Sequence, residues 1–75
     1  MASRESDLQA VGKRVRAARQ AAGLSQLRLA LAINVSLSTV VRLERGDGKK
    51  LDLHRLREVA DVLDADPYTL ITGGV

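Results

Sequence analysis

Residues 23–46 constrain the fold of this chain more than any other stretch, because they carry the start and stop signals of two short helices. Ser25 and Ser36 are residue types that cap helix N-termini, and each stands just before a segment with helical apolar spacing. Asn34 lies between the segments and tolerates the left-handed backbone of a tight turn. Gly46 follows the second segment, where helices commonly end. The pattern predicts two helices joined by a short turn.

The rest of the sequence predicts three further helices, so the fold class is all-α. One runs over about residues 7–22, one follows the cap Asp52 over about 53–63, and a short one starts at Asp66 with Pro67 in its first turn. Strand-like alternation is absent, and one compact five-helix domain over residues 1–75 is expected. The positions expected to be buried are Leu8, Val11, Val15, Ala18, Ala22, Leu29, Ala30, Val40, Leu43, Leu56, Val59, Ala60 and Leu63.

An ordered set of residues resembles the phage repressor and Cro-like helix-turn-helix family, whose domain is called lambda-repressor-like. The matching residues are Arg19, Gly23, Leu24, Ser25, Gln26, Leu29, Ala30, Val35, Ser36, Thr39, Val40, Glu44, Arg45 and Gly46. The resemblance covers roughly residues 8–72, and in size and layout the chain is similar to small controller-type regulators. It implies a helix-turn-helix unit at about 25–45 that binds a palindromic operator in double-stranded DNA. The protein would act as a dimeric transcription regulator with its second helix in the major groove.

The resemblance also implies roles for individual residues. The base-reading positions carried over from the family are Leu37, Ser38, Thr39 and Arg42. Leu37 and Val41 should both be exposed, one turn apart, where they could cover thymine methyl groups. The phosphate-binding positions are Gln26 at the start of the first helix of the unit, then Arg45, Lys49 and Lys50 beside the second.

Two further assignments concern structure and assembly. In the family, the positions of Arg19 and Glu44 form an ion pair between the first and third helices, and a partly buried pair is expected here. The helix at about 66–72 is expected to form the homodimer contact through Tyr68 and Ile71, with Leu70 in the core and Leu63 as a further candidate for the interface.

An alternative function remains open. Leu27 and Leu31 fall where the family usually carries polar surface residues, and they lie one turn apart on a predicted helix. Such a pair favours a contact with a partner protein. The alternative reading is therefore an antitoxin, or another protein-interaction module of the same fold.

Charge and composition agree with a nucleic-acid partner and argue against other classes. Residues 1–50 carry ten basic and four acidic side chains, whereas residues 51–75 carry two basic and five acidic ones. A basic surface suits phosphate. The chain has no cysteine and a single histidine, so neither a metal site nor any other cofactor is expected. We find no catalytic constellation, no membrane-spanning run and no signal-peptide core, so we expect a non-enzymatic, cytoplasmic protein.

Overall fold

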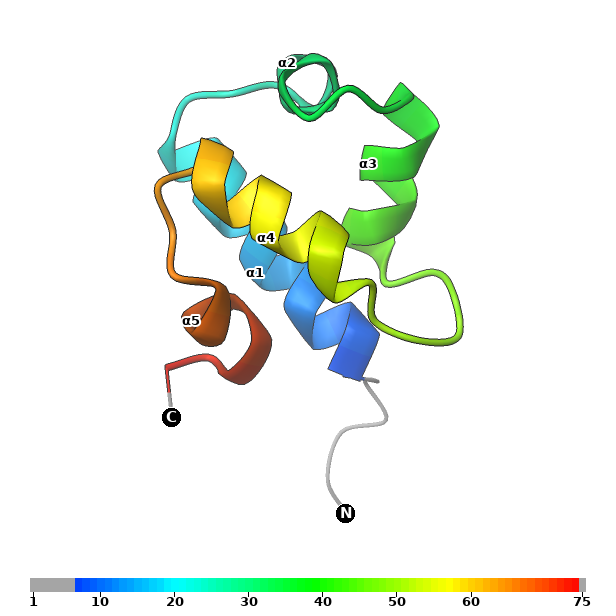
Figure 1. Cartoon of the computed structure of the whole chain (residues 1–75), viewed down its shortest axis with the longest axis vertical. Coiled ribbons are helices and arrows are strands. Elements are labelled where there is room, and N and C mark those ends of the chain that lie inside the picture. Colours follow the sequence, from blue (N-terminus) through cyan, green and yellow to red (C-terminus); the bar gives the residue numbers. More distant parts are fainter. Residues whose placement is uncertain (1–6, 75) are drawn as a thin grey trace.

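The computed structural model describes residues 7–74; residues 1–6 and Val75, which the sequence assigns to the same domain, lie outside the described part. Within it, all regular structure is helical, as predicted. The five helices are α1 (Asp7–Ala21), α2 (Gln26–Ala32), α3 (Leu37–Arg45), α4 (Leu53–Val62) and α5 (Pro67–Thr72). Figure 1 shows α3 and α5 on opposite sides of the pair formed by α1 and α4.

Three of the four linkers between helices are built alike: residues 22–25, 33–36 and 63–66. In each, the second residue has a positive φ: 75° at Gly23, 60° at Asn34 and 53° at Asp64. The third residue is apolar, and its N–H donates to a carbonyl five residues earlier, the hydrogen bond of a Schellman cap. The fourth residue caps the next helix with its side chain. Helices α1, α2 and α4 therefore end, and the next helix begins, within four residues.

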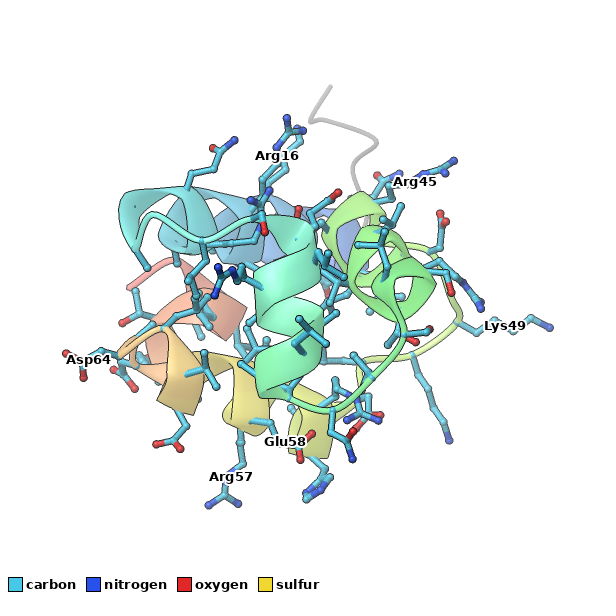
Figure 2. The ribbon with its side chains drawn as sticks, turned by 90° about the horizontal axis from the view of Figure 1, so that it is seen from above. Arg16, Arg45, Lys49, Arg57, Glu58 and Asp64 are labelled. Carbon is cyan, nitrogen blue, oxygen red and sulfur yellow. The ribbon has the colours of Figure 1, made fainter. Side chains whose placement is uncertain are left out.

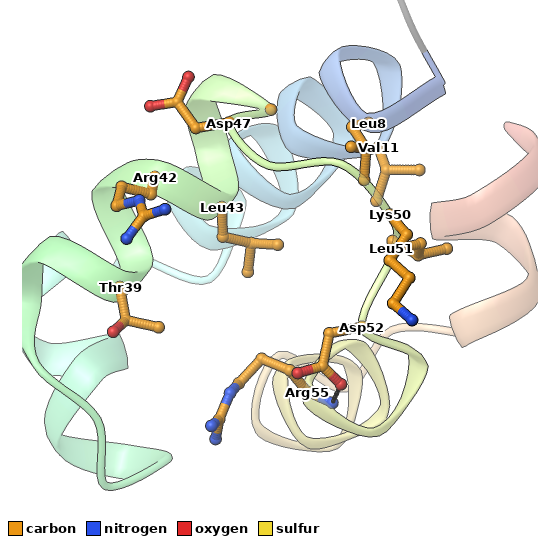
Figure 3. Close-up of a pocket in the computed structure, with 11 residues that line it drawn as sticks. Leu8, Val11, Thr39, Arg42, Leu43, Asp47, Lys50, Leu51, Asp52 and Arg55 are labelled. Atoms are coloured by element: carbon orange, nitrogen blue, oxygen red, sulfur yellow. Dashed lines mark hydrogen bonds between the residues drawn. The ribbon is translucent and has the colours of Figure 1, made fainter.

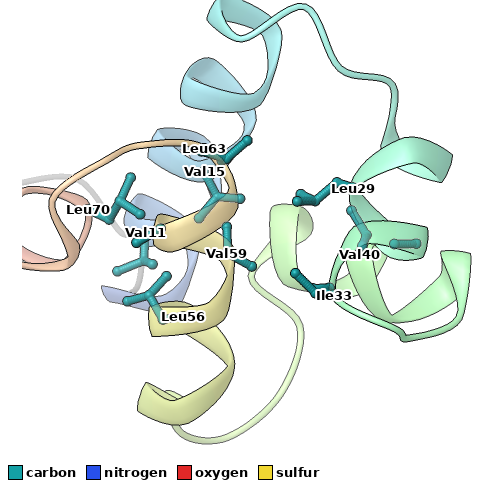
Figure 4. Close-up of a cluster of buried hydrophobic side chains, with 11 residues drawn as sticks. Val11, Val15, Leu29, Ile33, Val40, Leu56, Val59, Leu63 and Leu70 are labelled. Atoms are coloured by element: carbon teal, nitrogen blue, oxygen red, sulfur yellow. The ribbon is translucent and has the colours of Figure 1, made fainter.

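The core is a cluster of buried apolar side chains from all five helices (Figure 4). It consists of Val11, Val15, Leu29, Ala30, Ile33, Val40, Leu56, Val59, Ala60, Leu63 and Leu70. One predicted core position is wrong: Ala22 is exposed, because α1 already ends at Ala21 and the chain turns away at Gly23. Leu8 is only half-buried. Leu63, the C-cap of α4, is buried in the core as predicted, so it is not available as a residue of the dimer interface.

Two glycines let α1 lie directly against α3 and its C-terminus. A Cβ on Gly12 would lie 2.5 Å from the carbonyl oxygen of Glu44 and 2.6 Å from that of Leu43. A Cβ on Gly46, whose φ is 76°, would lie 2.5 Å from the Cα of Gln9. Both distances are shorter than any real contact, so only glycine permits this approach. The position of α3 on the domain is thus fixed by backbone packing against α1.

Candidate nucleic-acid interface

Helix α3 has one buried and one exposed side. Val40 and Glu44 are buried against the domain, whereas Leu37, Ser38, Arg42 and Arg45 are exposed. The prediction that Val41 is exposed is wrong, because its side chain is half-buried. The predicted pair of apolar contacts with thymine therefore rests chiefly on Leu37. An exposed row with one apolar group, hydroxyls and arginines offers the contact types that read base edges in the major groove.

Three hydroxyl groups meet at the N-terminus of α3. The Oγ of Ser36 accepts from the backbone N–H of Thr39 at 3.3 Å, and it lies 3.0 Å from Ser38 Oγ and 2.9 Å from Thr39 Oγ1. A hydroxyl has one hydrogen and two lone pairs, so these three partners saturate Ser36. One of the two neighbouring hydroxyls must therefore donate to Ser36 and the other must accept from it. Ser38 and Thr39 consequently present different hydrogen-bonding capacity to an incoming ligand.

The ion pair between Arg19 of α1 and Glu44 of α3 lies under the exposed row. Arg19 Nε donates to Glu44 Oε2 at 2.6 Å and Nη2 donates to Oε1 at 3.1 Å, with side-chain exposures of 9% and 3%. The third nitrogen, Nη1, donates to the Leu24 carbonyl at 2.8 Å. Such a bidentate, buried pair ties α1, α3 and the turn before α2 together. Its burial removes both groups from the surface that could touch DNA.

Gln26, a predicted phosphate contact, is joined to the same pair. It begins α2, and its Nε2 donates to Glu44 Oε1 at 3.1 Å. The side chain is half-buried and does not extend freely into solvent. Because an amide nitrogen carries two hydrogens, one N–H remains for another acceptor. The buried carboxylate thus holds the amide of Gln26 beside α3.

A cleft of 280 Å³ separates α3 from the start of α4 (Figure 3). Thr39 and Arg42 line it from α3, and Arg55 lines it from the first turn of α4. Arg55 is also paired with Glu58, at 2.7 Å. Sequence reasoning missed Arg55, because nothing local to residues 52–58 shows that this turn faces α3. The cleft brings a second arginine to the side of α3 that carries Arg42.

The predicted phosphate-binding cations at the C-terminal end of α3 and in the following loop are all exposed. Lys49 and Lys50 stand in the loop that leads to α4, and Arg45 is the last residue of α3. Arg45 Nε lies 3.7 Å from Asp47 Oδ2, an exposed ion pair that contributes little to stability and can be exchanged for another anion. Figure 2 shows Arg45 and Lys49 on the side formed by α3 and this loop, with Asp64 on the opposite side. These two cations of the basic part of the sequence therefore lie apart from Asp64 of the acidic part.

The residues assigned to assembly lie elsewhere. Tyr68 on α5 is 58% exposed, Ile71 is half-buried against the core, and Leu70 is buried. Leu27 and Leu31 on α2 are 53% and 68% exposed, so the structure leaves both apolar side chains on the surface.

No helix in residues 7–74 is long and apolar enough to cross a membrane. The same residues contain no group of three or more His, Asp or Glu side chains that could hold a metal ion.

The comparisons with known proteins agree with this geometry. The helix-turn-helix family matches residues 15–70. The restriction-modification controller protein C.AhdI from Aeromonas hydrophila superposes with a TM-score of 0.78 and 36% identity over 88% of this chain and 98% of its own. The clp gene regulator ClgR from C. glutamicum superposes with a TM-score of 0.84 and 28% identity over 95% and 90%. A search of curated proteins found no match.

The family match covers well over half of the chain, and the two structural neighbours are a controller protein and a gene regulator. The lambda-repressor-like fold and the non-enzymatic function predicted from sequence are therefore confirmed. The chain belongs to the helix-turn-helix family and is a DNA-binding transcriptional regulator.

Proposed function

We propose that the protein binds a palindromic operator as a homodimer, with α3 of each protomer in the major groove. The observation that carries the proposal is the exposed side of α3, where Leu37, Ser38 and Arg42 stand next to one another over a buried ion pair. Arginine suits the paired acceptors of guanine, and a leucine can cover a thymine methyl. Hydrogen bonds with the Ser36 hydroxyl orient the hydroxyl groups of Ser38 and Thr39 at the N-terminus of α3.

Phosphate contacts would hold α3 in the groove. Arg45, Lys49 and Lys50 flank one end of the helix and are free of strong ion pairs in the described structure, apart from the loose contact of Arg45 with Asp47. Gln26 would add an amide N–H from the start of α2. These contacts fix register and orientation but carry no sequence information themselves. Base reading is therefore assigned to Leu37, Ser38, Thr39 and Arg42 alone.

The dimer would form through α5. A helix-turn-helix dimer must hold its two recognition helices about 34 Å apart, which requires a contact remote from the DNA surface. Tyr68, the only Phe, Trp or Tyr residue of the chain, is exposed on α5. Helix α5 lies on the opposite side of the domain from α3 (Figure 1). Ile71 adds the exposed part of its side chain, although it also contributes to its own core. Tyr68 is therefore the main anchor of the proposed interface.

Selection from a pool of random duplexes tests the proposal. Purified protein should enrich a palindrome whose half-site centres lie about 10 base pairs apart, with two protomers bound per duplex. Enrichment of an unsymmetrical sequence bound by one protomer would refute the dimer. Tyr68→Glu should yield a folded monomer that keeps weak half-site binding. A Tyr68→Glu protein that remains dimeric in sedimentation would place the interface elsewhere.

A second function is favoured by the exposed pair Leu27 and Leu31. Two leucines more than half exposed and one turn apart can bind an apolar surface of a partner protein, as an antitoxin would. The double replacement Leu27→Ser with Leu31→Ser should leave affinity for the selected palindrome unchanged if the pair serves only a partner. A neighbouring reading frame that encodes a toxin would favour this function, and one that encodes a methyltransferase would favour a controller role.

A further inference from the structure

The C-terminus of α5 is closed in a different way from those of α1 to α4. In each of those four helices, the backbone N–H of the second residue after the helix donates to a backbone carbonyl of the last turn. In α5, Gly73 N–H donates to the Thr69 carbonyl at 2.8 Å, but Gly74 N–H donates to Thr72 Oγ1 at 3.1 Å. Within residues 7–74, the carbonyls of Leu70 and Ile71 accept hydrogen bonds from a side chain of α1.

The side chain that donates is that of Arg14. Its Nη1 donates to the Leu70 carbonyl at 3.1 Å and to the Ile71 carbonyl at 2.8 Å, across 56 and 57 residues of sequence. The guanidinium also places a positive charge at the negative end of the helix. A Cβ on Gly73 would lie only 3.1 Å from Arg14 Nη2, so glycine at this position lets the guanidinium approach the backbone. Arg14 therefore acts as the C-terminal cap of another helix.

The hydrogen bonds from Arg14 are important for the stability of α5, because this helix is only six residues long. A helix of that length does not hold together by itself in water. Within residues 7–74 it is fixed by the buried side chain of Leu70, by the Asp66 N-cap and by the two bonds from Arg14. Leu70 and Ile71 attach the C-terminal turn through apolar packing, and Arg14 adds hydrogen bonds from its side chain on α1, the helix that also packs against α3 through Gly12.

From this geometry we infer that Arg14 is a positioning residue for the homodimer. It holds α5 in the orientation in which Tyr68 and Ile71 meet a second copy of this chain. The inference rests on the proposed dimer through α5. Loss of Arg14 should therefore weaken dimerisation and, through it, binding to a full palindrome. It should leave intact the contacts that one protomer makes with one half-site.

The test compares three variants. Arg14→Ala removes both hydrogen bonds, Arg14→Lys keeps a charged donor, and Arg16→Ala removes the same charge from an exposed position on α1. Sedimentation equilibrium should show a dimer dissociation constant raised about tenfold or more for Arg14→Ala, as expected for lost bonds from a charged donor. Arg14→Lys should restore part of that loss, and Arg16→Ala should match the wild type in dimerisation. Affinity for a duplex with one selected half-site should be unchanged in Arg14→Ala.

An Arg14→Ala dimer as stable as the Arg16→Ala dimer would overturn the inference. So would a parallel loss of half-site binding, which indicates general unfolding. If circular dichroism shows that Arg14→Ala does not fold, Arg14→Lys decides: a folded protein with a weakened dimer supports the role, and a wild-type dimer refutes it. A wild-type protein that is monomeric, or a dimer unaffected by Tyr68→Glu, would instead refute the proposed dimer itself.

Discussion

Glu44→Ala should destabilise the domain severely, because it leaves the buried guanidinium of Arg19 without its carboxylate partner. The side chain of Arg19 is 9% exposed, and it would lose two charge-assisted bonds, of 2.6 and 3.1 Å, while its surroundings stay closed to water. Only the bond to the Leu24 carbonyl would remain. Breaking a buried pair by removing one partner costs roughly 3–5 kcal/mol. Gln26 would lose its acceptor as well.

This cost is large for a chain of 75 residues. At about 0.05–0.15 kcal/mol per residue, the total stability is roughly 4–11 kcal/mol. Because 1 kcal/mol shifts the Tm of such a domain by about 4–8 °C, Glu44→Ala should lower it by roughly 12–40 °C. Thermal unfolding followed by circular dichroism measures the effect. DNA binding of the fraction that stays folded should be nearly normal, since Glu44 lies on the buried side of α3.

Two controls separate the buried pair from charge in general. Glu58→Ala breaks the ion pair with Arg55, which at 2.7 Å is nearly as short as the buried pair but has side chains 31% and 37% exposed. This variant should cost at most about 1 kcal/mol. Replacing Arg19 by Met together with Glu44 by Leu should recover much of the stability, because no charge is then buried alone. A Glu44→Ala protein with unchanged melting but lost DNA binding would refute the argument and make Glu44 a functional residue.

Three further predictions concern packing, capping and charge. Gly12→Ala should destabilise the domain by about 1–3 kcal/mol in chemical denaturation, although alanine favours helices, because its Cβ would press on the Glu44 carbonyl; an unchanged or raised stability would contradict the close approach. Ser36→Ala should cost about 0.5–2 kcal/mol and weaken operator binding beyond that loss, since it releases Ser38 and Thr39; equal binding by the folded protein would exclude an orienting role. Operator affinity should fall steeply with salt, and Lys49→Ala should reduce the slope by about one unit; an affinity independent of salt would rule out phosphate binding by this loop.

Local chemistry explains why the helices could be predicted from sequence. The residue types of the linkers act within a few positions: Asn34 accepts a positive φ, and Ser25, Ser36 and Asp66 cap the helix that follows. The error at Ala22 has the opposite origin. Ala22 continues the helical spacing of the buried residues of α1, but the helix ends at Ala21, so this spacing no longer places Ala22 on the buried side.

Contacts between distant helices were harder to predict. The pairing of Arg19 with Glu44 was expected only because the sequence resembles a family in which those positions pair. The cap that Arg14 provides spans 56 residues and has no local pattern, since an arginine on a helix surface usually faces solvent. The hydrogen bond from Gln26 to Glu44 also has no local sequence pattern. It holds the side chain of Gln26, which was predicted to be a surface contact, in a half-buried position.

The central claim is that the exposed side of α3 reads bases, and the specificity of Arg42→Ala tests it most directly. Affinities of wild-type and variant protein should be measured for the selected palindrome and for every symmetric single-base replacement in its half-sites. Our account predicts that Arg42→Ala loses about 1–3 kcal/mol on the palindrome and no longer discriminates at one position, while preference at the others persists. A uniform loss over all duplexes, with discrimination retained at every position, would contradict it.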